Sequence, residues 1–183
     1  MNLARALSLA LLISILAFAA EIPRPAPADF LIPFPDGRTI KVGEMKGKVV
    51  VVEFLLTTCP GCQNAARILT KLMEEYGPKG VEVVGIAVNQ AAERDIGNFI
   101  TKSGATFPVG YRTLEAGLGF LQIPVVNRTH FPQMVFIDRA GVIRAQRGGE
   151  EEAFFIDEEK NIREELDKLV KPPVRKAAAA KKP

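Results

Sequence analysis

Cysteine, histidine and tryptophan are scarce in this sequence, whose 183 residues include two cysteines, one histidine and no tryptophan. A structural zinc site needs about four cysteine or histidine ligands, so these residues do not supply a tetrahedral metal site. A disulfide between Cys59 and Cys62 would close a very short loop. It would stabilise a fold by about 2 kcal/mol, against roughly 4 to 5 kcal/mol for a long loop. The pair is therefore better explained by reactivity than by a structural disulfide.

The body of the chain also lacks an excess of charge of either sign. The formal net charge is +3, but five of the 24 Lys and Arg lie in residues 171–183 and one lies in residues 1–19, and neither segment contains Asp or Glu. Residues 20–170 therefore hold 18 basic and 21 acidic side chains. A body this close to neutral is not typical of a nucleic-acid-binding protein, which carries a basic patch.

The first 19 residues have the pattern of a secretory signal peptide. Arg5 is followed by an apolar run over residues 6–20, and the residues at 17–19, Ala-Phe-Ala, fit a small-x-small cleavage site. The run has 15 residues, fewer than the roughly 20 that span a bilayer. We expect cleavage after Ala19 and an exported protein, in the periplasm or elsewhere outside the cytoplasm. An uncleaved short membrane anchor and a buried helix are the alternatives.

Composition divides the rest of the chain into a linker, a domain and a tail. Residues 20–28 contain three prolines, which predict a stiff, extended linker. Residues 29–170 have the patterning of a folded domain. Residues 171–183 form a basic segment rich in alanine, lysine and proline, which we expect to be disordered.

Hydrophobic periodicity predicts strands that alternate with helices across the domain. The expected order is a hairpin at 30–42, a buried strand at 49–56, a helix at 60–76, a buried strand at 81–88, a helix at 92–103, a short strand at 107–111, a short helix at 113–121, two strands at 133–138 and 142–146, and a final helix at 150–170. Strands that alternate with helices pair mainly in parallel, and the two closing strands add an antiparallel hairpin at one edge. The sequence therefore predicts an α/β sandwich.

The cysteines stand in the segment Cys59-Pro60-Gly61-Cys62, between a predicted strand and a predicted helix. Proline suits the first helical position, because the backbone N–H that it lacks would have no partner there, so Cys59 is the expected N-cap. Free N–H groups and the positive end of the helix dipole favour a thiolate at the N-cap, which predicts that Cys59 is the nucleophile. Cys62, almost one turn later, is expected to be the buried thiol that resolves a mixed disulfide. Two small buried residues that lie close by chance are the alternative.

Glu53 interrupts the apolar strand six residues before Cys59. Burial raises the pKa of a carboxyl because it disfavours the charged form, and such an acid at the base of the site can take and return the proton of Cys62. We expect this role for Glu53. The alternative is a position at a strand edge, where the side chain would reach solvent.

Pro132 stands just before the strand predicted at 133–138, and His130, the single histidine, lies two residues before it. A proline that enters a strand must avoid the hydrogen-bonding ladder. A cis peptide bond before Pro132 is possible but rare by base rate. A lone histidine is more often a surface or loop residue than a functional one, which is our expectation for His130.

Together these motifs resemble the thioredoxin superfamily, and most closely the TlpA-like and ResA-like exported thioredoxins, over residues 29–170. The features that carry the resemblance are the lead-in from Phe30 to Lys48, the acid Glu53, the pair Cys59 and Cys62, Pro132 before the strand and turn at 134–141, and the added segment at 92–121. The resemblance implies a thioredoxin-like three-layer α/β sandwich with a central mixed sheet, an N-terminal hairpin and a central insertion.

The resemblance also implies an activity and a site. A thiol–disulfide oxidoreductase of the cell envelope would exchange disulfides with partner proteins and would take electrons from a membrane or envelope donor. The direction of electron flow does not carry over from the family, because Pro60 and Gly61 between the cysteines are unusual and influence the reduction potential; our own expectation is a reductase. The Phe131–Pro132 bond would be cis, would face the disulfide and would offer backbone groups to an extended substrate. Thr58, where the family usually has tryptophan, and Pro60 would also contact the substrate. No cofactor or nucleic-acid partner is implied, and we expect a monomer.

Two other functions stay open at this point. A peroxiredoxin shares the fold, but its motif needs Thr or Ser three residues before the reactive cysteine, where this chain has Leu56, and a proline further back, where it has Val52. A binding or chaperone domain of this fold, with Cys59 and Cys62 permanently oxidised, would have no redox activity. Cycling of the cysteine pair with a dithiol would distinguish it from an enzyme.

Overall fold

The structure is a computed structural model that describes residues 21–171. The predicted signal peptide, at residues 1–19, lies outside the described residues, and so does the predicted tail from residue 172 onward. Within the described range, no helix combines the length and the apolar character needed to cross a membrane.

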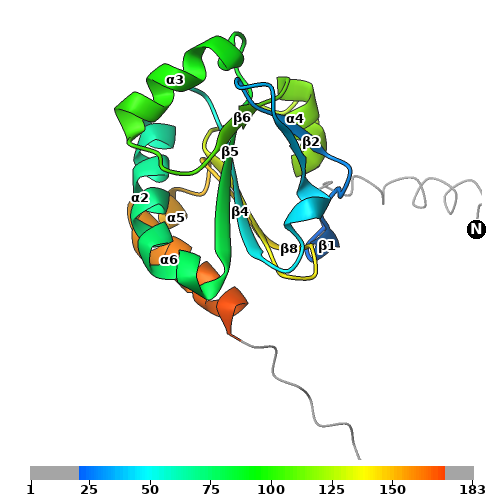
Figure 1. Ribbon diagram of the computed structural model, residues 1–183, viewed down its shortest axis with the longest axis vertical. Helices are drawn as coiled ribbons and strands as arrows, with labels where there is room; N and C mark the ends of the chain where they lie inside the picture. The colour runs from blue at the N-terminus through cyan, green and yellow to red at the C-terminus, as the bar shows by residue number, and fades with distance from the viewer. Residues whose placement is uncertain (1–20, 172–183) are drawn as a thin grey trace, which may run out of the picture.

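A six-stranded mixed sheet forms the middle layer of the domain (Figure 1). Its strands, in spatial order, are β1 (Arg24–Pro25), β8 (Val142–Gly148), β7 (Gln133–Ile137), β4 (Val49–Leu55), β5 (Val81–Ala87) and β6 (Val109–Tyr111). β4, β5 and β6 are parallel, whereas β7 pairs antiparallel with β4 and with β8, and β1 pairs antiparallel with β8. The predicted mixed sheet is confirmed.

The two faces of the sheet are covered differently (Figure 1). One face carries α2 (Pro60–Tyr76), α3 (Ala92–Ser103), α5 (Glu152–Ile156) and α6 (Glu158–Val170). The other carries α4 (Leu114–Leu121) and a hairpin of β2 (Leu31–Pro33) and β3 (Thr39–Lys41). Two short 3-10 helices, η1 (Val42–Met45) and η2 (Gly77–Lys79), follow β3 and α2. The domain is thus the predicted three-layer sandwich with an N-terminal hairpin, and the expected central insertion forms α3, β6 and α4.

The helix expected at 150–170 is in fact two helices. The chain leaves helical geometry at Asp157 (φ −110°, ψ 46°), which separates α5 from α6. The side-chain amide of Asn161 donates to the carbonyls of Ala153 (3.3 Å) and Phe154 (2.8 Å), so it satisfies carbonyls that the end of α5 leaves free. The break also sets the buried face of α5, because Phe154 is buried whereas the neighbouring Phe155 is only partly buried.

The closing hairpin of β7 and β8 does not lie at the edge of the sheet, contrary to expectation. β1, from the segment expected to be a linker, pairs with β8 and covers it. The guanidinium of Arg24 donates to the carbonyl of Phe120 (3.2 Å) and to the side chain of Gln146 (2.8 Å). These bonds tie β1 to α4 and to β8.

β4 is a central strand and is buried on both faces. Val52 and Phe54 pack toward α4 and the hairpin, whereas Val51 and Leu55 pack toward α2 and α6. Full burial of such side chains contributes roughly 1.5–3 kcal/mol each. Because side chains alternate along a strand, Glu53 lies on the face of Val51 and Leu55, beneath α2 and α6.

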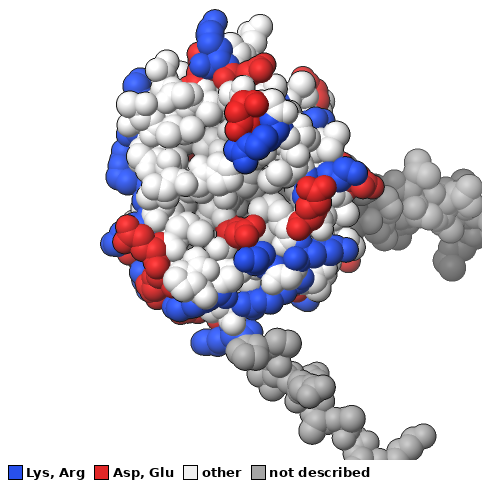
Figure 2. Space-filling model, in the orientation of Figure 1, with Lys and Arg blue, Asp and Glu red and all other residues white. Residues whose placement is uncertain are grey.

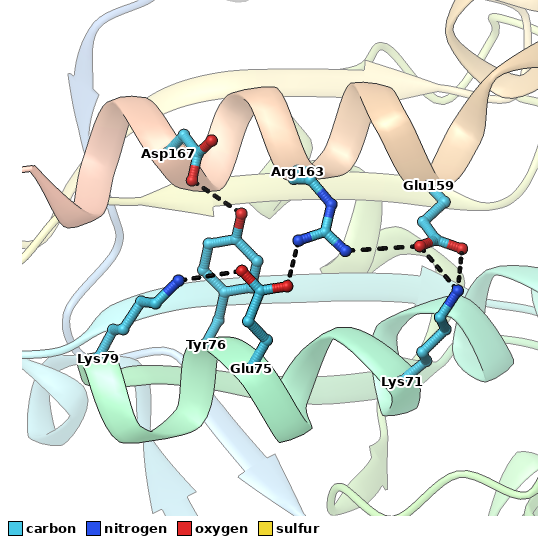
Figure 3. A network of polar contacts seen from close by, with 7 residues as sticks. All are labelled: Lys71, Glu75, Tyr76, Lys79, Glu159, Arg163 and Asp167. Atoms are coloured by element: carbon cyan, nitrogen blue, oxygen red, sulfur yellow. Dashed lines mark hydrogen bonds and ion pairs between the residues drawn. The ribbon is translucent and has the colours of Figure 1, made fainter.

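Polar contacts fasten α6 onto α2 (Figure 3). Tyr76 is 1% exposed, and its hydroxyl donates to Asp167 over 2.8 Å. Four ion pairs surround this contact, two between the helices (Arg163–Glu75 and Lys71–Glu159) and two between residues near in sequence (Lys79–Glu75 and Arg163–Glu159). Exposed ion pairs contribute about 0–1 kcal/mol each, so the buried tyrosine carries much of this contact.

Surface charge is mixed on the face seen in Figure 2. Red and blue side chains lie around a largely uncharged centre, with several blue side chains along the lower edge, and exposed ion pairs of the described residues include Arg38–Asp36 and Arg94–Asp95.

Candidate active site

The two cysteines lie where β4 ends and α2 begins. Cys59 is the N-cap of α2, with an extended backbone (φ −78°, ψ 121°), and Pro60 occupies the first turn of the helix, as the sequence predicts. The backbone N–H of Cys62 donates to Cys59 Sγ over 3.4 Å. One of the free N–H groups of the helix start is therefore directed at the sulfur.

The two thiols differ in exposure. Both cysteines are free, but Cys59 is half-buried whereas Cys62 has no exposed surface. Burial raises the pKa of the Cys62 thiol, and the nearby Glu53 adds to that shift. A partner can reach Cys59, whereas Cys62 must lose its proton inside the protein.

The Phe131–Pro132 peptide bond is cis, as the resemblance implied. The Cys59 thiol donates to the carbonyl of Phe131 over 3.7 Å. Pro132 is buried, and its Cδ would lie 3.7 Å from a Cβ at Gly61, which is also 3.7 Å from Cys59 Sγ. The proline loop therefore packs directly against the cysteine motif.

Glu53 is fully buried in the centre of the sheet. It pairs in register with Gly85 of β5 and Met134 of β7, so the alternative of an exposed strand edge is wrong. Neither carboxyl oxygen has a hydrogen-bond partner among the described residues. Burial raises the pKa of Glu53 well above its usual range, and the charges of Glu158 and Cys59 raise it further. The carboxyl can thus hold a proton at a pH where an exposed glutamate is ionised.

Asn89 holds the loop before Cys59, a role that sequence reasoning missed. Its side-chain oxygen accepts from the Thr57 N–H (2.9 Å), and its amide donates to the Thr57 hydroxyl (3.0 Å). Gln63 donates to the Thr57 carbonyl (3.3 Å). The available signal was a polar residue just after β5, because the carboxyl ends of neighbouring parallel strands meet at one edge of a sheet.

Gln133 fixes the proline loop and was also missed. It is 1% exposed, and its amide donates to the carbonyl of His130 (2.8 Å) and to Glu150 (3.0 Å). His130 itself is exposed and contributes its backbone to this contact. A polar residue beside a proline at the start of a buried strand was the signal in the sequence.

A second buried carboxyl, Glu158, is the first residue of α6 and was not predicted. It is 6% exposed, and its Oε2 accepts from the side-chain amide of Asn64 over 2.9 Å. Burial raises the pKa of Glu158 to about 7, although the hydrogen bond from Asn64 lowers it. Its spacing of four residues from the buried Ile162 was the signal, because residues four apart share a helix face.

A groove of about 850 Å³ opens beside the proline loop. Leu56, Val88, Tyr111 and Phe131 give it a largely apolar wall. Phe131, expected to contact substrate, lines it. Thr58 and Pro60, expected to do the same, are exposed but lie outside the groove. Across residues 21–171, no group of three or more His, Cys, Asp or Glu side chains is arranged to hold a metal ion.

Comparison with protein families identifies the family to which this chain belongs. The redoxin family matches residues 24–166, a range that contains both cysteines, Glu53 and Pro132. The chain belongs to the redoxin family.

Proteins named as thiol-disulfide oxidoreductases are among those to which this redoxin is similar. Thiol-disulfide oxidoreductase ResA of Halalkalibacterium halodurans is 26% identical over 145 residues, which are 79% of this chain and 74% of the relative. The ResA of Bacillus thuringiensis strain Al Hakam is 29% identical over 133 residues, 72% of either chain. A crystal structure of a thioredoxin-family thiol:disulfide interchange protein from Chlorobium tepidum has a TM-score of 0.63 at 23% identity, covers 84% of this chain and 100% of its own, and shows the shared fold. The redoxin described here is a thiol–disulfide oxidoreductase with a thioredoxin-like fold.

Proposed function

We propose that this redoxin is an exported reductase that transfers two electrons from the thiols of Cys59 and Cys62 to a disulfide of a partner protein. One arrangement carries the proposal: an accessible Cys59 at a helix N-cap, 3.7 Å from the carbonyl of Phe131, beside a buried Cys62. It combines a nucleophile, a resolving thiol and a backbone docking site.

The reaction begins when the Cys59 thiolate attacks one sulfur of the partner disulfide. The Cys62 N–H and the start of the 17-residue helix α2 stabilise the negative sulfur. A bond forms between Cys59 Sγ and the attacked sulfur, the partner's S–S bond breaks, and its other sulfur leaves as a thiolate that takes a proton from water. An extended partner segment can lie along the Phe131–Pro132 loop and place a side chain in the apolar groove.

The second step is intramolecular. Cys62 passes its proton to Glu53, the buried carboxyl on the same face of the sheet. The Cys62 thiolate attacks Cys59 Sγ, the Cys59–Cys62 bond forms, and the partner's second sulfur leaves. The redoxin has then lost two electrons and the partner has gained them. A dithiol donor of the cell envelope restores the two thiols by the reverse exchange.

The few contacts of Cys59 Sγ support reduction as the preferred direction. A strong oxidant of this type stabilises its reduced thiolate form. Among the described residues, one N–H, that of Cys62, donates to Cys59 Sγ. Such limited support of the thiolate is typical of an electron donor rather than of a strong oxidant.

Leu56 argues against a peroxidase. Peroxide reduction needs a hydroxyl beside the thiolate to polarise the O–O bond, and Leu56, three residues before Cys59, has no donor in its side chain. The hydroxyl of Thr57 is held by Asn89. Disulfide exchange needs no such donor.

Export is part of the proposal. Its support is the pattern of residues 1–19, with Arg5, a short apolar run and the small residues at 17 and 19. Outside the cytoplasm the partners are proteins that bear disulfides, and the electron donor is a membrane or envelope protein.

Trapping tests the proposal. With Cys62 replaced by serine, Cys59 attacks a partner disulfide and stays joined to it, so a mixed disulfide is expected on a non-reducing gel and in the mass spectrum. The variant that also carries Cys59→Ser is the control and traps nothing. The wild-type protein is expected to reduce insulin with a dithiol as donor. The reduction potential of its Cys59–Cys62 pair is expected to be about −270 mV. A reduction potential of about −120 mV would instead indicate an oxidase. If hydrogen peroxide oxidised Cys59 orders of magnitude faster than it oxidises an ordinary exposed thiol, the protein would be a peroxidase.

A further inference from the structure

We infer that Glu158 acts through Glu53 as a relay that carries the proton of Cys62 between the buried site and solvent. The inference rests on the proposed disulfide exchange and assigns a residue to its second step. Glu158 does not contact the reacting sulfurs in this role and is a positioning residue for the proton.

The two carboxyls lie on the same face of the sheet. Glu158 is one helical turn before Ile162, which packs in the same cluster as Val51 and Leu55, the residues on either side of Glu53 along this face. Both oxygens of Glu53 and one of Glu158 are buried without a hydrogen-bond partner among the described residues. The charge of Glu158 also raises the pKa of Glu53. Buried polar atoms without partners are uncommon in native proteins and require an explanation.

Glu158 has a path to solvent, whereas Glu53 is 0% exposed. A cavity of about 560 Å³ between α2 and α6 is lined by Glu158 and Asn64, and by Asp157 and Lys160, which are exposed. Asn64 is exposed as well and donates to Glu158. A proton on Glu158 can therefore reach water without a rearrangement of the core.

The surroundings leave Glu158 without a paired cation in the part of the chain that the structure describes. The charged and titratable groups around it are Glu53 on β4, Arg67 on α2, and Asp157, Glu159, Lys160 and Arg163 around the cavity. α5 adds the apolar Phe155 and Ile156. Arg67 donates to Asn64 rather than to Glu158, and Glu159 and Arg163 belong to the contacts of Figure 3.

The proton balance follows from this arrangement. Burial raises the pKa of Glu53 well above its usual range and the pKa of Glu158 to about 7, so Glu53 can hold a proton in the core while Glu158 exchanges one with water near neutral pH. As Cys62 becomes a thiolate, its proton passes to Glu53, the proton of Glu53 passes to the Glu158 carboxylate, and Glu158 releases it through the cavity. No electrons move in these transfers, and re-reduction of the disulfide runs them in reverse.

The test separates the two chemical steps. Reduced protein is mixed with a peptide disulfide whose two thiols report separately on the attack by Cys59 and on the release by Cys62, and both rates are followed by stopped flow from pH 5 to 9. In the wild-type protein the second rate is expected to rise with pH and level off above pH 7. Glu158→Gln keeps the side-chain volume and an acceptor for Asn64. It should remove this inflection and slow the second step by about tenfold at pH 7.5, with the first step unchanged.

Two matched variants and one opposite outcome make the result decisive. Glu159→Gln removes the same charge from the neighbouring position and should leave both steps as in the wild type. Glu158→Asp keeps a titrating carboxyl and should keep the inflection. A second step that is unchanged or faster in Glu158→Gln would overturn the relay, because a merely repulsive Glu158 raises the pKa of Glu53 and its removal would help ionisation. A wild-type protein that shows no second release would instead contradict the proposed function itself.

Discussion

Glu53 faces a residue without a side chain at the centre of the sheet. Its partner across β5 is Gly85, and a Cβ there would lie 3.1 Å from Val109 and 3.2 Å from Leu55. Close packing thus leaves no room at position 85 for a lysine or arginine side chain that could pair with Glu53. The carboxyl is kept neutral by burial instead, and the fold bears the cost when it ionises.

The pH dependence of stability should reveal this cost. Because the pKa of Glu53 is raised in the folded state, the folded protein binds the proton more tightly than the unfolded chain does. Its contribution to stability is complete below about pH 4.3 and is lost as pH rises toward the folded pKa. The free energy of unfolding should fall between pH 5 and 8 in the wild type and fall less in Glu53→Leu.

Urea unfolding at pH 5, 6.5 and 8 measures this difference. Glu53→Leu should be more stable than the wild type at pH 8, by about 1–3 kcal/mol. In this variant the free energy of unfolding should still fall slightly with pH, and this fall should level off near pH 7, because burial raises the pKa of Glu158 to about 7. Equal slopes in the two proteins would mean that Glu53 does not carry a raised pKa.

Sequence reasoning found residues whose signal is local and missed those whose partner is distant. Cys59 and Pro60 are recognisable from a strand, a helix start and their spacing, and the N-cap geometry follows from neighbours in the chain. Asn89 bonds Thr57 across 32 positions and Glu158 bonds Asn64 across 94. Periodicity can place such residues on a face, but the contact itself depends on how the elements pack.

At the scale of elements, periodicity predicted the strands β2 to β8 and the α-helices of the domain body, but neither 3-10 helix nor the break at Asp157. Apolar residues continue on either side of the break, and neither glycine nor proline marks the end of α5. Its last carbonyls are instead capped by Asn161 from within the next helix. β1 was missed for a related reason. Its two residues pair with β8 through their backbones. A segment rich in proline does not predict a strand, because proline is tolerated only at the edge of a sheet.

The contact between α2 and α6 predicts a measurable loss of stability. Tyr76→Phe removes the hydroxyl that donates to Asp167 and keeps the buried ring. The free energy of unfolding should fall by about 0.5–1.5 kcal/mol, the usual contribution of one hydrogen bond. Lys79→Ala, which removes an exposed ion pair with Glu75, is the control and should change stability by less than about 1 kcal/mol. A Tyr76→Phe variant as stable as the wild type would place the strength of this contact elsewhere.

At the scale of the whole molecule, the topology brings distant segments to one edge of the sheet. The cysteines follow β4, Asn89 follows β5, and Pro132 precedes β7, which lies beside β4. The order of elements predicted the sandwich because strands that alternate with helices allow few topologies. The order of elements could not predict how deeply each side chain is buried, because burial depends on how all three layers pack together.

The N-terminus of the mature protein is a prediction about the whole chain. When the full sequence is expressed in a bacterium, the purified protein should begin at Ala20, because residues 17–19 form the cleavage site. N-terminal sequencing of the exported fraction gives the answer. Bulky leucines at positions 17 and 19 should block processing in the matched control. A cytosolic protein that retains Met1 would rule out export.

The late position of α6 in the chain has a consequence in time. A ribosome releases the cysteine motif well before α6, yet α6 supplies Glu158, and its Ile162 and Leu166 belong to the core cluster that encloses Cys62. Until residue 170 has emerged and α6 has docked, the nascent chain has two thiols but neither their shelter nor the second carboxyl. Disulfide exchange at full rate therefore has to wait for the last helix, and until α6 docks both thiols stay accessible to other thiols and to oxidants.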